Sequence, residues 1–129
     1  MNNTDTIIVT GGAGYIGSHT IIELLEQTDF RVISLDNYSN STEDTYRRIN
    51  EITGKRNRLA WFKVNLCNKE ELMDTLKQAN SIKGIIHFAA FKSVPESVAD
   101  PLLYYHNNME SLVNILCLCR EKKIRNFIF

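Results

Sequence analysis

The chain has 129 residues, of which 43% are hydrophobic and 23% charged, the composition of one ordinary compact domain. Fifteen basic and fifteen acidic residues cancel, so no basic surface favours a nucleic-acid partner. The longest apolar runs contain only a few residues, far fewer than the roughly 20 of a membrane span, so we expect no membrane partner. The polar N-terminus, residues 1–5, has no positively charged region followed by an apolar stretch, so nothing favours export.

The cysteines favour neither a disulfide framework nor a metal site. The chain has an odd number of cysteines and no C-x-x-C pair; the three are Cys67, Cys117 and Cys119. Cys117 and Cys119 fall in a helical pattern, where residues two apart point to opposite sides. We therefore expect no metal ligands and interpret the three residues as thiols of a cytoplasmic protein.

The first half of the chain alternates short apolar runs with helical patterns. The run at residues 6–10 predicts a strand, and a helix is predicted over residues 14–27. The inward side of this helix is predicted to consist of Ile16, Ile21, Leu24 and Leu25. Residues 31–36 predict a second strand, and a charged helix is expected over residues 41–52, with Gly54 at its C-cap.

The second half continues the alternation. A third strand is predicted over residues 60–65, and Asn68 is the expected N-cap of a helix, with Glu71 completing a capping box. The helical spacing behind this cap is that of Leu72, Met73, Leu76 and Ala79. Residues 84–88 predict a fourth strand, and residues 126–129 a fifth. The apolar stripe of the last helix is expected to comprise Met109, Leu112, Val113 and Leu116.

This alternation predicts an α/β doubly wound Rossmann fold. Short apolar strands that alternate with helices form parallel sheets covered on both faces, and the expected strand order is 3-2-1-4-5. No linker divides residues 1–129, so we expect a single domain. Because an apolar strand is seldom left at a sheet edge, we also expect the chain to be the front portion of a longer protein, truncated at the fifth strand.

A glycine-rich turn joins the first predicted strand to the first helix. Gly12, Gly14 and Gly17 fit G-x-G-x-x-G, while Gly11, Gly14 and Gly17 fit G-x-x-G-x-x-G. Glycine permits a tight turn, close approach of a pyrophosphate to the backbone, and close packing of helix on strand. The helix N-terminus then presents N–H groups and a partial positive charge to the phosphates.

An acidic residue at the end of the second strand makes a dinucleotide site more specific. Asp36 stands about 20 residues after the turn, where a carboxylate can accept hydrogen bonds from an adenosine ribose. It would also repel a 2′-phosphate, which favours NAD over NADP. Flavin and S-adenosylmethionine sites use related turns, and a purely structural turn is the alternative.

Four motifs in order resemble the 4-epimerase branch of the extended short-chain dehydrogenase/reductase family. They are T-G-G-A-G-Y-I-G-S-H (residues 10–19), D-N-Y-S-N-S (36–41), H-F-A-A-F-K-S-V-P-E-S (87–97) and P-L-L-Y-Y-H-N-N (101–108). Residues 126–129 are similar to the strand that, in the family, leads into the catalytic serine loop. The resemblance covers essentially the whole chain.

The resemblance implies three groups of residues around NAD. Those at the pyrophosphate would be Gly11, Gly14, Tyr15, Ile16 and Gly17. Those at the adenosine would be Asp36, Asn37, Asn40, Ser41, Asn65 and Leu66. Those beneath the cofactor toward the nicotinamide, and on the helix that backs it, would be Phe88, Ala89, Ala90, Lys92 and Asn107.

One position departs from the family pattern. Asn65 stands where relatives usually carry an aspartate that accepts from the adenine amino group, and an amide oxygen accepts without charge assistance, so we expect a weaker contact. Simpler interpretations remain for other residues: Lys92 as a solvated side chain, and Asn107 and Asn108 as helix caps. We expect the three histidines to be structural, namely His19, His87 and His106. We expect Tyr104 and Tyr105 to be packing aromatics.

The resemblance implies the reaction of this family, which interconverts UDP-galactose and UDP-glucose through a 4-keto intermediate. The substrate would be a UDP-sugar. The base in this family is the tyrosine of Y-x-x-x-K, yet no tyrosine here is followed by lysine four residues later. We therefore expect no catalytic residue in this chain. Two alternatives remain, namely another nucleotide-sugar enzyme (a 4,6-dehydratase or a UDP-glucuronate epimerase) and a non-catalytic NAD-binding module. A homodimer is an assembly that the resemblance allows.

Overall fold

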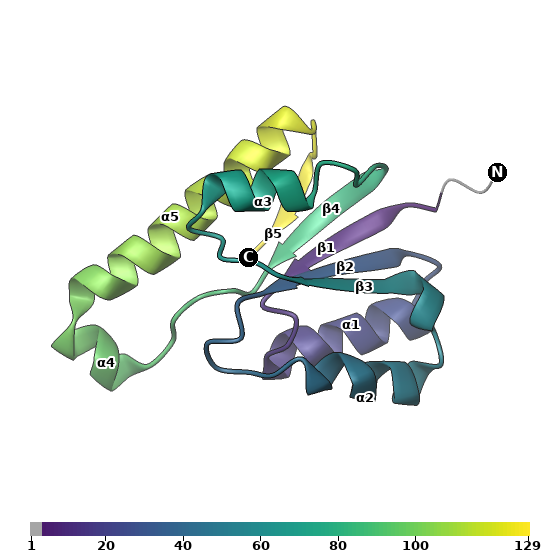
Figure 1. Ribbon diagram of the computed structural model, residues 1–129, viewed down its shortest axis with the longest axis horizontal. Coiled ribbons are helices and arrows are strands. Elements are labelled where there is room, and N and C mark those ends of the chain that lie inside the picture. The colour runs from purple at the N-terminus through teal and green to yellow at the C-terminus, as the bar shows by residue number, and fades with distance from the viewer. Residues whose placement is uncertain (1–3) are drawn as a thin grey trace.

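Five parallel strands form one sheet in the order β3-β2-β1-β4-β5 in the computed structural model, which describes residues 4–129 (Figure 1). The strands are β1 (Thr6–Thr10), β2 (Arg31–Asp36), β3 (Leu59–Lys63), β4 (Ile82–His87) and β5 (Asn126–Ile128). The helices are α1 (Tyr15–Gln27), α2 (Asp44–Thr53), α3 (Lys69–Thr75), α4 (Val94–Ala99) and α5 (Pro101–Glu121), with a 3-10 turn at Arg56–Arg58. The predicted doubly wound Rossmann fold and its strand order are confirmed. Residues 1–3 of the polar N-terminus lie outside the described residues.

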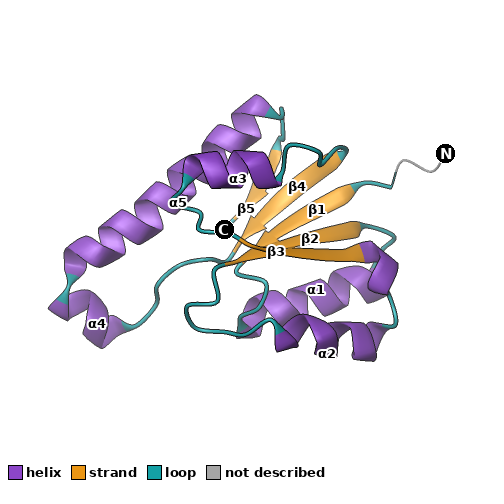
Figure 2. Ribbon diagram, viewed as in Figure 1, coloured by secondary structure: helices purple, strands orange, loops and turns teal. Residues whose placement is uncertain are grey.

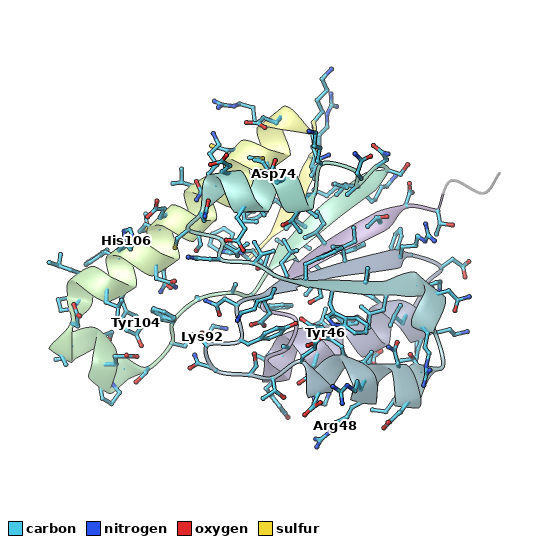
Figure 3. All side chains as sticks on the ribbon, in the orientation of Figure 1. Tyr46, Arg48, Asp74, Lys92, Tyr104 and His106 are labelled. Carbon is cyan, nitrogen blue, oxygen red and sulfur yellow. The ribbon has the colours of Figure 1, made fainter. Side chains whose placement is uncertain are left out.

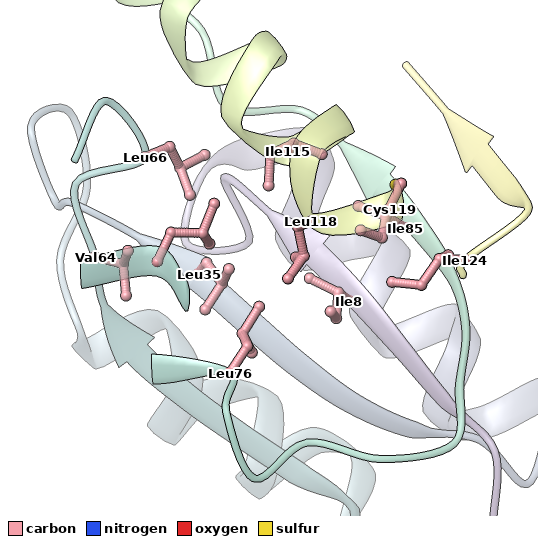
Figure 4. Packing of buried hydrophobic residues seen from close by; sticks show 11 residues of the cluster. Ile8, Leu35, Val64, Leu66, Leu76, Ile85, Ile115, Leu118, Cys119 and Ile124 are labelled. Atoms are coloured by element: carbon pink, nitrogen blue, oxygen red, sulfur yellow. The ribbon is translucent and has the colours of Figure 1, made fainter. Parts of the chain in front are cut away.

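Helices cover both faces of the sheet (Figure 2). Successive residues of β1 point to opposite faces, so Ile7 and Val9 pack under α1 and α2, whereas Ile8 packs under α3 and α5. Figure 4 shows the second of these two cores, which consists of Ile8, Leu35, Val64, Leu66, Leu72, Leu76, Ile85, Ile115, Leu118, Cys119 and Ile124. In the described part of the chain, no helix is long and apolar enough to cross a membrane.

Two predicted boundaries, the start of α2 and the end of β3, are wrong. The helix α2 begins at Asp44, later than expected, because Ser41 is held in the preceding loop by a hydrogen bond from its hydroxyl to Asp36 (3.2 Å). The strand β3 ends at Lys63, earlier than expected, and the N–H of Val64 then donates to the carbonyl of Asp36 (3.0 Å).

The predicted inward side of α1 is wrong at one residue. Ile21 and Leu25 are buried, and Leu24 is half-buried against the same core, but Ile16 is 55% exposed. Gly17 occupies the inward position instead, because it is the residue that packs directly on the backbone of the preceding turn. Ile16 is consequently rotated outward.

The segment between β4 and α5 contains a helix that the sequence did not predict. The helix α4 begins after Ser93, whose hydroxyl accepts from the N–H of Glu96 (3.4 Å). The N-cap of α5 is Asp100, whose carboxylate accepts from Leu103 (3.2 Å), so the interpretation of Asn107 and Asn108 as caps is wrong.

The predicted apolar stripe of α5 faces outward. Met109, Val113 and Leu116 are between 45% and 55% exposed, and Leu112 is half-buried. The buried face of α5 consists of Ser111, Asn114, Ile115, Leu118 and Cys119. Asn114 can be buried because its amide donates to the carbonyl of Leu66 (2.8 Å), so the pattern of apolar residues alone selected the wrong face.

The buried hydrogen bond from Asn114 to Leu66 should contribute measurably to the stability of the fold. Asn114→Ala should lower the free energy of unfolding by about 1–3 kcal/mol, because the Leu66 carbonyl is left buried without its partner. The matched control is Asn80→Ala, since the amide of Asn80 also donates to a carbonyl (Gln78, 3.2 Å) but is exposed; that change should stay within about 0.5 kcal/mol. Urea denaturation measures both. Equal losses in the two variants would contradict the prediction.

Candidate cofactor site

All the residues that the sequence predicts around the cofactor line one cleft of about 410 Å³ at the carboxyl ends of the strands. This is where open α/β sheets bind ligands. The cleft has further walls that the sequence analysis did not assign to the site, namely Leu35, Ser39, Val64, Cys67, Phe91, Ser93 and Ser111. The fold therefore brings together segments that are far apart in the sequence.

The glycines at the start of α1 differ in what the fold requires of them. Gly11 adopts a left-handed conformation (φ 69°), and its N–H donates to Leu35 (2.7 Å). A Cβ on Gly17 would overlap the Gly11 carbonyl oxygen. A Cβ on Gly14 would lie 3.3 Å from that oxygen, with nothing else within 4 Å. The fold therefore requires glycine at position 17, whereas the absence of a side chain at Gly14 leaves open space in the cleft.

The N-terminus of α1 faces this room without a side-chain cap. Gly14 is the N-cap residue, with φ −75° and ψ 175°, and there is no acidic residue in the first turn. The first N–H groups of a helix have no intrahelical acceptor and carry partial positive charge, so they can bind an anion. Tyr15 and Ile16 flank them and are exposed at the cleft.

The carboxylate of Asp36 is almost entirely buried and accepts three hydrogen bonds. Oδ1 accepts from the N–H of Tyr38 (2.8 Å) and the hydroxyl of Ser41, and Oδ2 accepts from the N–H of Ala13 (3.0 Å). A carboxylate has about four acceptor positions. One position on Oδ2 is thus left without a partner among residues 4–129, at the wall of the cleft.

The opposite wall is fixed by Thr10 at the end of β1. Its hydroxyl oxygen accepts from the N–H of Ala89 (3.2 Å) and lies 2.6 Å from Nδ1 of His87. Burial, and to a lesser extent the positive charge of Lys92, lower the pKa of His87, which is therefore neutral at pH 7. A neutral His87 fits the predicted structural role, and the bond from the Ala89 N–H to Thr10 attaches the Ala89 segment to β1.

Asn65 is partly engaged within its own loop. Its side-chain oxygen accepts from the N–H of Cys67 (3.0 Å), a local turn that holds the residue at the cleft. The thiol of Cys67 donates to the carbonyl of Asn107 (3.5 Å). Burial first, and then the negative charge of Glu110, raise the pKa of this thiol, so Cys67 is not an activated nucleophile.

Asn108 holds the loop after β4, a role that sequence reasoning did not predict. Its amide oxygen accepts from the N–H of Phe91 (2.8 Å), and its amide nitrogen donates to the Phe91 carbonyl (3.1 Å). Asn107, which the sequence placed at the site, donates to the same oxygen of Asn108 (3.0 Å). The only signal in the sequence is the N-N pair, which does not show that the second asparagine holds the loop.

The cleft can bind and orient a ligand, but its described residues offer no base for sugar chemistry. Of the two tyrosines expected to be packing aromatics, Tyr104 packs against another ring, whereas Tyr105 is 68% exposed, so that expectation is wrong for Tyr105. Tyr104 packs on Phe91 (5.6 Å between ring centroids), and its hydroxyl is occupied by Ser93 and Glu96. Within residues 4–129 there is no group of three or more His, Cys, Asp or Glu side chains placed to hold a metal ion.

A family model described as GDP-mannose 4,6 dehydratase matches residues 8–129. The chain belongs to this family. Two curated relatives are a UDP-glucose 4-epimerase of Bacillus subtilis (strain 168), 48% identical over 116 residues, and UDP-glucose 4-epimerase 1 of Oryza sativa subsp. japonica, 47% identical over 112 residues. The family membership indicated by the sequence motifs is thereby confirmed.

Among solved structures, the chain is similar to a UDP-glucose 4-epimerase from Bifidobacterium longum, determined in complex with NAD⁺ and UDP. The TM-score is 0.89 at 39% identity, and the match covers 96% of this chain and 36% of that one. The matches to the Bacillus and Oryza relatives cover 90% and 86% of this chain but 33% and 31% of theirs. The chain thus spans about a third of the length of the family members it matches here.

The glycine geometry predicts opposite stabilities for two alanine variants. Gly17→Ala should lower the free energy of unfolding by about 3 kcal/mol, because its Cβ overlaps backbone atoms that cannot move aside. Gly14→Ala should change it by less than about 1 kcal/mol, since its backbone angles suit any residue and its Cβ meets a single atom. Thermal unfolding by circular dichroism measures both. A larger loss for Gly14→Ala than for Gly17→Ala would contradict this assignment.

Proposed function

We propose that the chain binds NAD in this cleft and forms the cofactor-binding part of a UDP-glucose 4-epimerase. The observation that carries the proposal is the space beside Gly14 at the uncapped N-terminus of α1, with the remaining acceptor of Asp36 in the same cleft. These are the two contacts by which a Rossmann turn recognises a pyrophosphate and a ribose.

Different residues of the cleft would contact different parts of the cofactor. The N–H groups at Tyr15 and Ile16 would hold the pyrophosphate, and Oδ2 of Asp36 would accept from a ribose hydroxyl. The adenosine side would be completed by Asn37, Asn40, Ser41, Asn65 and Leu66, and the nicotinamide side by Phe88, Ala89, Ala90, Lys92 and Asn107. When bound, NAD supplies reversible hydride acceptance at a sugar carbon. The apolar wall at Phe88 and Ala89 would exclude water from that region.

The names of the relatives favour an epimerase over the alternatives. The Bacillus and Oryza relatives, at 48% and 47% identity, are both named UDP-glucose 4-epimerases. A 4,6-dehydratase is the second candidate, because the matching family model has that description. A homodimer stays a prediction, and the exposed Met109, Val113 and Leu116 on α5 support it as a contact surface.

A chimera tests whether this chain can serve as the cofactor-binding part of an epimerase. Residues 1–129 would replace the matching third of the Bacillus subtilis relative, and the product formed from UDP-galactose and from UDP-glucose would be identified by NMR. We expect interconversion of the two sugars, and loss of both activity and bound NAD in the Gly14→Val chimera, whose side chain fills the pyrophosphate space. A chimera that retains NAD but does not interconvert the sugars would contradict the epimerase proposal.

Cofactor choice tests the role of Asp36. The wild-type chain should bind NAD at least about tenfold more tightly than NADP, a difference of about 1.4 kcal/mol, because a 2′-phosphate would meet the buried carboxylate. Asp36→Ala should weaken binding of both, since the loop contacts to Ala13 and Tyr38 are lost, but it should abolish the preference. The measured quantity is therefore the ratio of the two dissociation constants, by calorimetry.

Ser41→Ala is the matched control for this ratio. It removes one hydrogen bond to Asp36 (3.2 Å) and keeps the negative charge. Affinity should fall for both cofactors while their ratio stays near the wild-type value. A wild-type chain that binds NADP as tightly as NAD would refute the assignment of Asp36 to the ribose.

A further inference from the structure

The helix α5 holds the segment between β4 and α4 at two points. Asn108 pairs with both backbone groups of Phe91, at 2.8 and 3.1 Å. One turn earlier on the helix, the hydroxyl of Tyr104 accepts from the N–H of Ser93 (3.0 Å) and donates to Glu96 (2.7 Å). The Tyr104 ring also packs on that of Phe91.

Lys92 lies between these two points. It lines the cleft together with Phe91 and Ser93, yet its side chain is exposed and forms no ion pair with any residue of the described range 4–129. Figure 3 shows Tyr104 and Lys92 on the side of the molecule where α4 and the start of α5 project away from the sheet. Here the sheet gives the segment no support, so the direction of Lys92 depends on the backbone to either side of it.

We propose that Asn108 and Tyr104 are positioning residues, which fix the backbone around Lys92 so that its ammonium group points into the cleft to meet the phosphate charge of a dinucleotide. The inference rests on the proposed function for its ligand, but not for its geometry. Hydrogen bonds to both flanking residues restrict the backbone dihedral angles of Lys92. Because the Lys92 backbone is already fixed before the ligand binds, less conformational entropy is lost on binding.

His87 reports the position of Lys92 without any ligand. The positive charge of Lys92 contributes to the lowered pKa of His87, so removing or redirecting that charge should raise the pKa. An NMR titration of the His87 ring, assigned with a His87→Gln variant, would be recorded for Lys92→Gln as reference. Asn108→Ala and Tyr104→Phe should raise this pKa in the same direction as Lys92→Gln. Tyr105→Phe is the control, because Tyr105 is 68% exposed on the same helix, and it should leave the titration unchanged.

Calorimetry with NAD⁺ then tests the consequence. Tyr104→Phe and Asn108→Ala should each weaken binding roughly three- to tenfold, the range for one lost hydrogen bond, with unfolding curves recorded to exclude global loss of structure. Asn108→Asp, which keeps the acceptor for the Phe91 N–H, should recover part of the affinity.

An unchanged His87 titration in Asn108→Ala and Tyr104→Phe overturns the proposal, and so does an unchanged titration in Lys92→Gln. If the wild-type chain does not bind NAD⁺ while the His87 shifts appear as expected, the proposed function fails and the positioning role stands. Affinity that falls equally in Tyr105→Phe and Tyr104→Phe also overturns it.

Discussion

The close contact between α1 and the turn that precedes it determines how the rest of the site is arranged. Gly17 lies so near the backbone of Gly11 that no side chain fits between them. This brings the N-terminus of α1 to the end of β1, beside the end of β4, where the N–H of Phe88 bonds to Thr10 (3.1 Å). Because β1 is central in the sheet, the cleft forms where neighbouring strands lead to helices on opposite faces.

Asp36 serves both the structure and the ligand, and the two roles depend on each other. Its three hydrogen bonds tie the glycine turn, through Ala13, to the loop after β2. The cost of burying a carboxylate is offset by such hydrogen bonds. Asp36 also lines the cleft, where Oδ2 has room for one further hydrogen bond. A residue that merely bound a ribose at the surface would be free to rotate away.

The features that follow from local chemistry could be predicted from the sequence. The strands, their order and the Asn68 cap depend on periodicity and turn residues. Most of the predicted cofactor residues came from the resemblance of contiguous motifs to a family, and they left seven other residues of the cleft unassigned. What could not be predicted depends on contacts between distant segments. The start of α2 depends on the bond from Ser41 to Asp36, and the role of Asn108 on a backbone segment 17 residues away. The outward rotation of Ile16 follows from packing at Gly17, which a hydrophobicity pattern does not record.

The helix α5 explains why an apolar pattern selected the wrong face. Its inward residues change character along its length: Tyr104, Asn108, Ser111 and Asn114 near the cleft, then Ile115 and Leu118 over the sheet. Tyr104, Asn108 and Asn114 bond to irregular backbone after β3 and β4, whose N–H and carbonyl groups need hydrogen-bonding partners. The Ser111 hydroxyl donates instead to the carbonyl of Asn108 within the helix. Ile115 and Leu118 cover strands whose backbone is already paired, so only apolar packing remains to be gained. The inward face of α5 is therefore polar where it supports the site and apolar where it supports the fold. A prediction that looks for one continuous apolar stripe does not find this face.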